Sequence, residues 1–180
     1  TKTLVTPAIV ADRLTDLPNE RGFLQAVQER NAAGYFLLCD LDKFKAVNDE
    51  HGHPEGDEVL KNFAQFLRRN TRHDLFGKRS YDIVAGRLHG DEFAVWIDGK
   101  SGYLGASGLA ARVRHWRSLR YPQVSASVGI GSTIDLADTA MYEEKYARRA
   151  LELLTPKTGD MQIPNGLRNP DTVPWDYRKS

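Results

Sequence analysis

The ten residues from Arg87 to Trp96, Arg-Leu-His-Gly-Asp-Glu-Phe-Ala-Val-Trp, constrain the fold more than any other stretch. Their second half, continued by Ile97, is an apolar run of strand length, rich in β-branched and aromatic residues. The centre has the composition of a tight turn, in which Gly90 can take positive φ. The sequence therefore predicts a β-hairpin with Asp91 and Glu92 at its corner. Alone, these carboxylates belong either to a solvated turn or to half of a metal site.

A second acidic cluster favours the metal site. The apolar run that begins at Tyr35 leads directly into Asp40-Leu41-Asp42. Alternation along a strand places the two aspartates on the same side and Leu41 on the other. A carboxylate at the end of a buried strand needs a partner, because an unpaired buried charge is costly. Asp40 and Asp91 together would form an oxygen-rich site suited to Mg²⁺, with Lys45 within reach of a phosphate that such a metal holds.

Composition is typical of one ordinary globular domain, since the 180 residues are 41% apolar and 27% charged. A net charge of +1 gives no general attraction to nucleic acid, and we expect no direct membrane contact. Cys39 stands alone, so no intramolecular disulfide forms and a cytoplasmic location is allowed. The chain contains neither an apolar stretch of transmembrane length nor a signal-peptide pattern. Because it begins at Thr1, we expect that an upstream sensory or membrane domain is missing.

Three segments are predicted along the chain: a polar, extended lead-in (1–18), one domain (19–155) and a Pro-rich extended tail (156–180). Within the domain, helices are expected from Asn19, from Glu55, around Leu109 and over 136–154. Together with the strands, they give the order strand-helix-strand-strand-helix-strand. This order predicts an α+β, ferredoxin-like (split βαβ) fold, whose central sheet contains antiparallel strands and is flanked by helices. RNA-binding domains share this core, but their aromatic stacking motif is absent.

At four blocks in order, covering roughly residues 12 to 150, the chain resembles the GGDEF family, the catalytic domain of bacterial diguanylate cyclases. The first block is Asp12-Arg13-Leu14-Thr15-Asp16-Leu17-Pro18-Asn19, and the third is the hairpin, with His-Gly-Asp-Glu-Phe as its signature. The second runs from Asp40 to Asp49, followed by Gly52-His53 and Gly56-Asp57. The last is Ser127-Val128-Gly129-Ile130, then Ala140-Met141-Tyr142, Lys145 and Arg149. The resemblance implies a nucleotidyl-cyclase, palm-type core.

The activity that the resemblance implies is condensation of two GTP molecules into cyclic di-GMP, with release of two pyrophosphates. Each subunit of an antiparallel homodimer would hold one GTP, and each 3′-hydroxyl would attack the α-phosphate of the other nucleotide. Such chemistry needs a divalent metal, Mg²⁺ or Mn²⁺, and cations on the leaving group. The implied metal ligands are Asp40, Asp91 and the Leu41 carbonyl, and the implied general base is Asp91 or Glu92.

The resemblance also assigns substrate contacts. Phosphates would be bound by Lys45, Lys145, Arg149 and the backbone amides of Lys43 and Phe44, and guanine by Asn48 and Asp57. His53 occupies a third substrate-linked position, and His89 and Gly90 lie where the hairpin approaches the nucleotide. Each residue also has a structural explanation: Lys145 and Arg149, four residues apart, would suit a solvated helix face, and Asp57 would suit the first turn of a helix.

Several residues depart from the family pattern. His89 replaces the first glycine of the signature, Arg148 stands where the family has glycine, and Asp16, Glu20 and Ala150 are further differences. The segment from Arg79 to Asp82 has the form of the family's R-x-x-D product-inhibition site. It lies one residue farther from the signature than usual, with Gly86 as the apparent insertion, which would reverse side-chain facing unless a bulge absorbs it.

These departures leave three functions open. The first is an active diguanylate cyclase. The second is a catalytically degenerate domain that binds GTP or cyclic di-GMP as a signalling module, which His89 and the altered last block favour. The third is a related cyclase with another product, against which Asn48 and Asp57 argue because they suit guanine.

Overall fold

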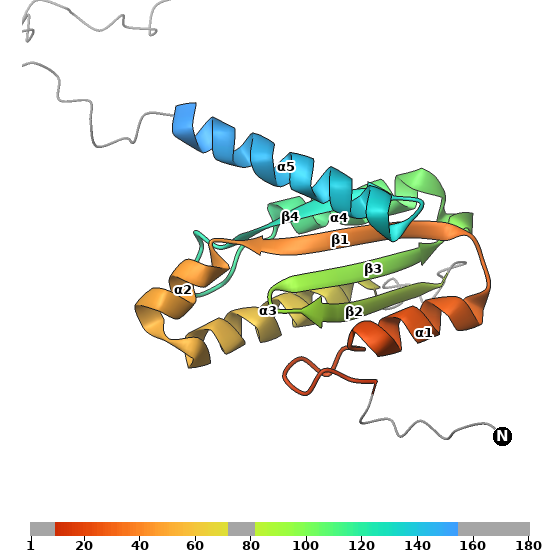
Figure 1. Cartoon of the computed structure of the whole chain (residues 1–180), viewed down its shortest axis with the longest axis horizontal. Coiled ribbons are helices and arrows are strands. Elements are labelled where there is room, and N and C mark those ends of the chain that lie inside the picture. Colours follow the sequence, from red (N-terminus) through yellow and green to blue (C-terminus); the bar gives the residue numbers. More distant parts are fainter. Residues whose placement is uncertain (1–9, 72–81, 155–180) are drawn as a thin grey trace, which may run out of the picture.

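A four-stranded antiparallel sheet forms the centre of the fold, with the strand order β2-β3-β1-β4 (Figure 1). The computed structural model describes residues 10–71 and 82–154. The sheet order is that of the split βαβ core, so the predicted fold class is confirmed. In chain order, the elements are α1 (Glu20–Arg30), β1 (Gly34–Asp42), α2 (Phe44–His51), α3 (His53–Thr71), β2 (Ile83–His89), β3 (Glu92–Asp98), the 3-10 helix η2 (Gly99–Ser101), α4 (Gly102–His115), β4 (Ser125–Gly131) and α5 (Ile134–Leu154).

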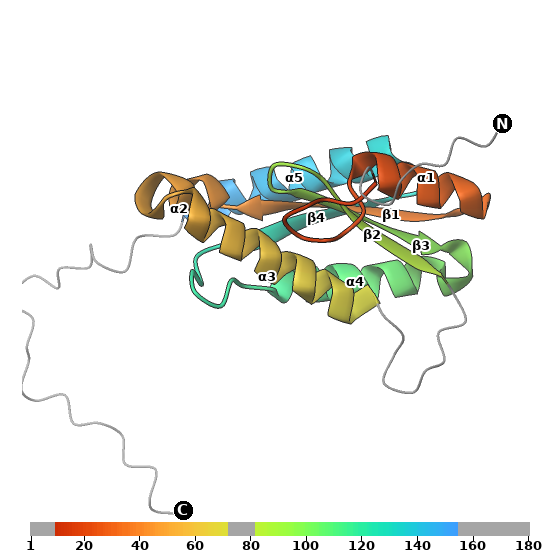
Figure 2. The same cartoon turned by 90° about the horizontal axis from the view of Figure 1, so that it is seen from below.

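Helices cover both faces of the sheet, with α1 and α5 on one side and α3 and α4 on the other (Figure 2). Side chains alternate along β1 accordingly: Leu37, Cys39 and Leu41 join the larger core beneath α3 and α4, whereas Leu38 joins the smaller core beneath α1 and α5. In the larger core, the fully buried ring of Phe63 contacts Phe93 and Trp116 edge-on. No helix in the described ranges is long and apolar enough to cross a membrane.

Two helices begin earlier than the sequence predicted. The long helix α3 starts at His53 instead of Glu55, because Gly52 takes a positive φ of 87° and breaks the chain sharply after α2. Pro54 is tolerated there, since the amides of the first helical turn have no partner within the helix. The helix expected around Leu109 already begins at Gly102, within a glycine-rich stretch, and Ala106 and Leu109 bury one face of this helix, α4.

Residues 10–18, the described part of the predicted lead-in, make a tight turn instead of an extended run. Asp12 accepts hydrogen bonds from both the amide and the hydroxyl of Thr15, and Ala11 pairs with Pro18. Leu17 is only 3% exposed and joins the larger core. The turn forms because one carboxylate satisfies two nearby donors. The domain boundaries stay predictions, and residues 1–9 and the predicted tail 156–180 lie outside the described residues.

The outer edge of β4 is covered by an ion pair. Val128 lies on this edge strand, and its amide donates to the Glu144 carboxylate (3.3 Å), while its carbonyl accepts from Arg114 (3.3 Å). Arg114 and Glu144 also pair with each other at 2.6 Å. Because unpaired edge groups invite association with other strands, this cap both satisfies the backbone and protects the edge.

Helix α5 packs closely on β4 through two glycines. A Cβ atom on Gly129 would overlap the backbone of Ala137 and Met141, and one on Gly131 would overlap that of Leu136 and Ala137. The two buried residues of α5, Ala137 and Met141, lie in its first half. The absence of a side chain at Gly129 and Gly131 therefore determines how near α5 can lie to the sheet.

We expect Gly129→Ala to lower the free energy of unfolding by about 1–3 kcal/mol, the usual cost of overpacking a tight contact. Gly108→Ala is the matched control: Gly108 lies exposed within α4 with open space around it. There the added methyl should raise stability by up to about 1 kcal/mol through helix propensity. Urea denaturation of both variants checks the prediction, and equal effects at the two sites would contradict it.

Candidate active site

Residues from both acidic clusters come together at one end of the sheet. The C-terminal end of β1, the β2–β3 turn, the start of α2 and the second half of α5 all lie there, at the left of Figure 1. In the β1–β3 register, Asp40 lies opposite Glu92. The Leu41 amide donates to the Asp91 carbonyl at 3.3 Å, which joins the two acidic segments directly. The predicted meeting of Asp40 and Asp91 therefore follows from β1 and β3 being the two central strands.

An arginine holds the hairpin corner in place. Gly90 has a positive φ of 54°, whereas the φ of Asp91 is not positive. This is the pattern of a turn that needs positive φ only at its first central residue. The guanidinium of Arg87 donates to the Gly90 carbonyl at 3.0 and 2.7 Å and to the Asp12 carboxylate at 3.2 Å. Sequence reasoning missed this role of Arg87, because Asp12 lies 75 positions away.

Asp40 and Asp91 interact electrostatically. Asp40 is only 8% exposed, and its carboxylate pairs with the Lys145 ammonium at 2.5 Å. Burial raises the pKa of Asp91, and the negative charge of Asp40 raises it further. The half-buried Asp91 carboxyl and the nearby negative charge of Asp40 form a centre that attracts cations.

The donor set fits Mg²⁺. Among the described residues, no group of three or more His, Cys, Asp or Glu side chains could by itself hold a metal ion. Mg²⁺ does not need such a cage, since it commonly binds one or two carboxylates together with substrate phosphates and water. Asp40 and Asp91 supply the two carboxylates, and Lys145 provides the cation that now neutralises Asp40.

A cavity of about 620 Å³ opens beside these acids. Six of its lining side chains are cationic and three are acidic, so its charge suits a polyanion. The cations are Lys43, Lys45, Arg117, Lys145, Arg148 and Arg149, and the acids are Asp42, Asp91 and Glu152. The sequence had indicated Lys45, Lys145 and Arg149 as phosphate-binding cations and Lys43 only through its backbone amide. Arg117 was missed, and Arg148 was noted only as a departure from the family pattern.

The start of α2 faces the same cavity. Lys43, at the N-cap, has a left-handed backbone (φ 63°) and no side-chain capping bond, and it pairs with Glu152 at 2.8 Å. Phe44 and Lys45 follow and line the cavity. The first amides of a helix without a capping side chain can donate to an anion, so the expected phosphate contacts of Lys43 and Phe44 are geometrically available.

The residues expected to bind guanine lie elsewhere. Asn48 is on α2, and its side chain lies over Gly56, where a Cβ atom would collide with it. Asp57 follows Gly56 on α3. His53 is exposed at the start of α3. None of the three lines the 620 Å³ cavity, so their role in binding guanine stays a prediction.

His89, the variant residue of the signature, pairs with Glu92. Its Nε2 atom lies 2.8 Å from the Glu92 carboxylate, and 68% of its side chain is exposed. Burial raises the pKa of Glu92, whereas the positive charge of His89 acts to lower it. The imidazole therefore points toward solvent and pairs with Glu92, one of the two candidate catalytic acids.

The predicted product-inhibition site is only partly described. Asp82 pairs with Arg30 of α1 at 2.5 Å, and Arg79 lies outside the described residues. The register of β2 shifts between Arg87 and His89, so Leu88 forms a bulge in this strand. Gly86, the predicted insertion, is in regular register opposite Ala94.

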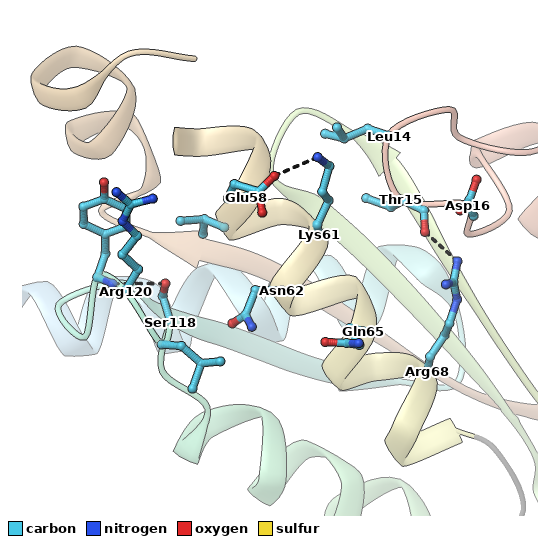
Figure 3. A pocket seen from close by; sticks show the side chains of 13 residues that line it. Leu14, Thr15, Asp16, Glu58, Lys61, Asn62, Gln65, Arg68, Ser118 and Arg120 are labelled. Carbon is cyan, nitrogen blue, oxygen red and sulfur yellow. Dashed lines mark hydrogen bonds and ion pairs between the residues drawn. The ribbon is translucent and has the colours of Figure 1, made fainter. Parts of the chain in front are cut away.

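A second cavity, of about 560 Å³, lies between the first turn and the α4–β4 loop, over α3 (Figure 3). Its three cations already have partners: Lys61 pairs with Glu58 at 2.8 Å, Arg120 pairs with Glu55 at 2.8 Å, and Arg68 donates to the Thr15 carbonyl at 2.5 Å. Asp91 does not line this cavity, whereas Asp91 and Leu41 both line the 620 Å³ cavity. The 620 Å³ cavity is therefore the better candidate for the active site.

Comparison with known proteins matches residues 9–151 to the family described as diguanylate cyclase, GGDEF domain. Two curated relatives are the bifunctional diguanylate cyclase/cyclic di-GMP phosphodiesterase MucR of Pseudomonas aeruginosa and the diguanylate cyclase DgcS of Shewanella oneidensis. MucR is 36% identical over 74% of this chain, and DgcS is 30% identical over 81%. The chain spans only 22% of the length of MucR and 52% of that of DgcS.

Solved structures share the fold. The diguanylate cyclase SiaD of Pseudomonas aeruginosa, solved with its activator SiaC, has a TM-score of 0.60 and 27% identity, covering 78% of this chain and 60% of its own. The GGDEF domain of DgcB from Caulobacter crescentus, solved with c-di-GMP, has a TM-score of 0.60, covering 82% of this chain and 94% of its own. At 23% identity, DgcB supports the fold alone.

Asp12→Asn should lower the free energy of unfolding by about 1 kcal/mol at pH 7, because it weakens hydrogen bonds to a charged acceptor. Burial would by itself raise the pKa of Asp12, but the hydrogen bonds from Thr15 and Arg87 outweigh it and lower the pKa below 3.8. The stabilisation is therefore complete above the unfolded value of 3.8 and lost as the pH falls through the lower folded value. Denaturation at pH 7 and at pH 3 measures the difference, which should shrink at the lower pH.

Asp91→Asn is expected to do the opposite and to stabilise the ligand-free protein by about 0.5–1 kcal/mol at pH 7, after allowance for solvent screening. A raised pKa means that ionised Asp91 is disfavoured in the folded state. The gain in stability should therefore vanish below pH 3.8, where Asp91 of the wild type is protonated in both the folded and the unfolded state and is neutral like the asparagine. Thermal melting with and without Mg²⁺ provides the check. If Mg²⁺ raised the melting temperature of the variant as much as that of the wild type, the assignment of Asp91 as a metal ligand would be wrong.

Proposed function

The chain belongs to the diguanylate cyclase, GGDEF domain family, and we propose that it binds GTP in the 620 Å³ cavity and condenses two GTP molecules to cyclic di-GMP. One observation carries this proposal: Asp91, whose ionisation is opposed by the nearby charge of Asp40, lines a cavity together with six cations. Two acids suit a divalent metal, and the cations suit the triphosphate that the metal would accompany. The named activities of MucR and DgcS support it.

In the proposed reaction, the 3′-oxygen of each GTP forms a bond to the α-phosphorus of the other, and the bond from that phosphorus to the pyrophosphate breaks. Glu92 is the proposed proton acceptor, since its pKa is raised and so lies closer to neutral pH than that of an ordinary glutamate. Lys45, Lys145 and Arg149 bind the phosphates and the leaving pyrophosphate. Asp40, Asp91 and the Leu41 carbonyl would hold Mg²⁺ or Mn²⁺, which, when bound, supplies charge neutralisation and acidifies the attacking hydroxyl.

Because each cavity supplies one nucleotide, we propose that two copies of the chain face each other during turnover. Asn48 and Asp57 are the proposed guanine contacts, with His53 nearby, and His89 and Gly90 are proposed to border the bound nucleotide. A bacterial cytoplasmic location, where GTP is available, fits this activity.

A binding module without turnover is the second candidate. The observation that favours it is the 2.8 Å pair between His89 and Glu92, which engages the proposed proton acceptor and adds bulk at the signature turn. Such a domain would bind GTP or cyclic di-GMP through the same cavity and signal by contact.

Incubation of concentrated protein with GTP and Mg²⁺, followed by chromatography, tests the cyclase. We expect cyclic di-GMP from the wild type and at least about a 100-fold loss of rate in Asp40→Ala and Asp91→Ala, the scale on which loss of charge stabilisation acts. Asp135→Ala is the control, because Asp135 is exposed at the start of α5, away from the cavity. Full activity in Asp40→Ala would refute the metal site.

His89→Gly separates the two candidates. Absence of product from wild type shown to be dimeric, together with measurable GTP binding by calorimetry, would favour the binding module. If product then appeared in His89→Gly, the pair with Glu92 would be identified as the cause of the inactivity. Equal turnover in the wild type and His89→Gly would instead show that the variant signature is tolerated.

A further inference from the structure

The second half of α5 is held on the sheet by charges instead of apolar packing. The two buried residues of α5, Ala137 and Met141, lie in its first half, and no side chain from 142 to 154 is fully buried. This half nevertheless carries Lys145 and Arg149, the cations proposed to bind phosphate. Whatever fixes it therefore determines where those cations lie.

Two matched ion pairs cross from α5 to the end of β1. Asp40 and Asp42 point to the same side of the strand, and they pair with Lys145 at 2.5 Å and with Arg148 at 3.3 Å. The predicted same-side placement of the two aspartates is thus confirmed, and each of them receives a cation from α5. Binding of a metal at Asp40 would compete with the Lys145 pair, whereas the Arg148 pair would remain.

Asp42 is built to hold Arg148. Its side chain is 16% exposed and accepts hydrogen bonds from the hydroxyls of Ser125 and Ser127, both at 2.9 Å. Arg148 also donates to Ser125 and lies 3.3 Å from Glu144, which is itself fixed by the β4 edge cap. Arg148 thus connects α5 to both β1 and β4 while it lines the cavity.

We propose that Arg148 is a positioning residue for phosphate binding: through Asp42 it holds the second half of α5 in place, so that Lys145 can leave Asp40 for a phosphate without the helix moving away. The proposal rests on the proposed function, because it presumes that the cavity binds phosphates. It assigns a task to a residue that stands where the family pattern has glycine.

Arg148→Met removes the charge but keeps the long side chain and a similar helix propensity. We expect backbone amides in 142–154 to exchange hydrogen about tenfold faster in this variant, since their protection depends on local contacts. We also expect affinity for inorganic pyrophosphate, measured with Mg²⁺ by calorimetry, to fall about 3- to 10-fold. Arg148→Lys should restore part of both effects, because it returns a charge to the Asp42 carboxylate.

Arg149→Met is the matched contrast. The Arg149 side chain is exposed and forms no hydrogen bond or ion pair with other residues of 10–71 and 82–154. We expect the Arg149→Met variant to lose affinity for pyrophosphate while hydrogen exchange in α5 stays unchanged. Asp42→Asn should reproduce Arg148→Met in both measurements, and the double variant Asp42→Asn/Arg148→Met should be no worse than either single variant.

Unchanged exchange in Arg148→Met would overturn the proposal, and so would additive losses of affinity in the double variant, which would indicate that Arg148 binds phosphate directly. Faster exchange together with unchanged pyrophosphate affinity would also overturn it. A wild type that does not bind pyrophosphate would overturn both this proposal and the proposed cavity. Weakened binding together with faster exchange in Arg148→Met, in a protein that makes no cyclic di-GMP, would support the positioning role and refute only turnover.

Discussion

The site depends most on the ion pairs between α5 and the end of β1. Close contact with Gly129 and Gly131 fixes the first half of α5, but its second half lacks buried side chains. Lys145 and Arg148 hold that half against Asp40 and Asp42, and α2 adds the pair between Lys43 and Glu152. A cation in an ion pair can switch from a carboxylate to a ligand, whereas an apolar side chain cannot leave a packed core without loss of that packing. An ion-paired helix can therefore hold its position and still offer cations to a ligand.

The acids of the site repel one another, and the surrounding structure maintains that arrangement. Asp40 opposes ionisation of Asp91, a cost to stability that is common where function concentrates charge. Arg87 braces the turn by bonding to the Gly90 carbonyl and to Asp12. The turn in residues 10–18, which the sequence suggested was only part of a lead-in, therefore supports the hairpin that carries Asp91.

Local patterns predicted much of the molecule. Alternation placed Asp40 and Asp42 on one side of β1, the composition of the hairpin located its corner at Gly90, and the element order indicated the split βαβ sheet. The starts of α3 and α4 were predicted too late, because a glycine there was taken as loop or turn. Gly52 breaks the chain sharply through its positive φ, whereas the burial of Ala106 and Leu109 outweighs the low helix propensity of the glycines in α4.

The sequence by itself determined which residues are candidates for the chemistry, because side-chain type, strand alternation and motif order are local properties of the chain. The tertiary structure alone decided which of them touch. Arg87 and Asp12 are 75 positions apart, Arg148 and Asp42 are 106 apart, and Arg114 meets Glu144 around the edge of β4. No periodicity specifies such partners, since they depend on how helices and strands distant in sequence pack in three dimensions.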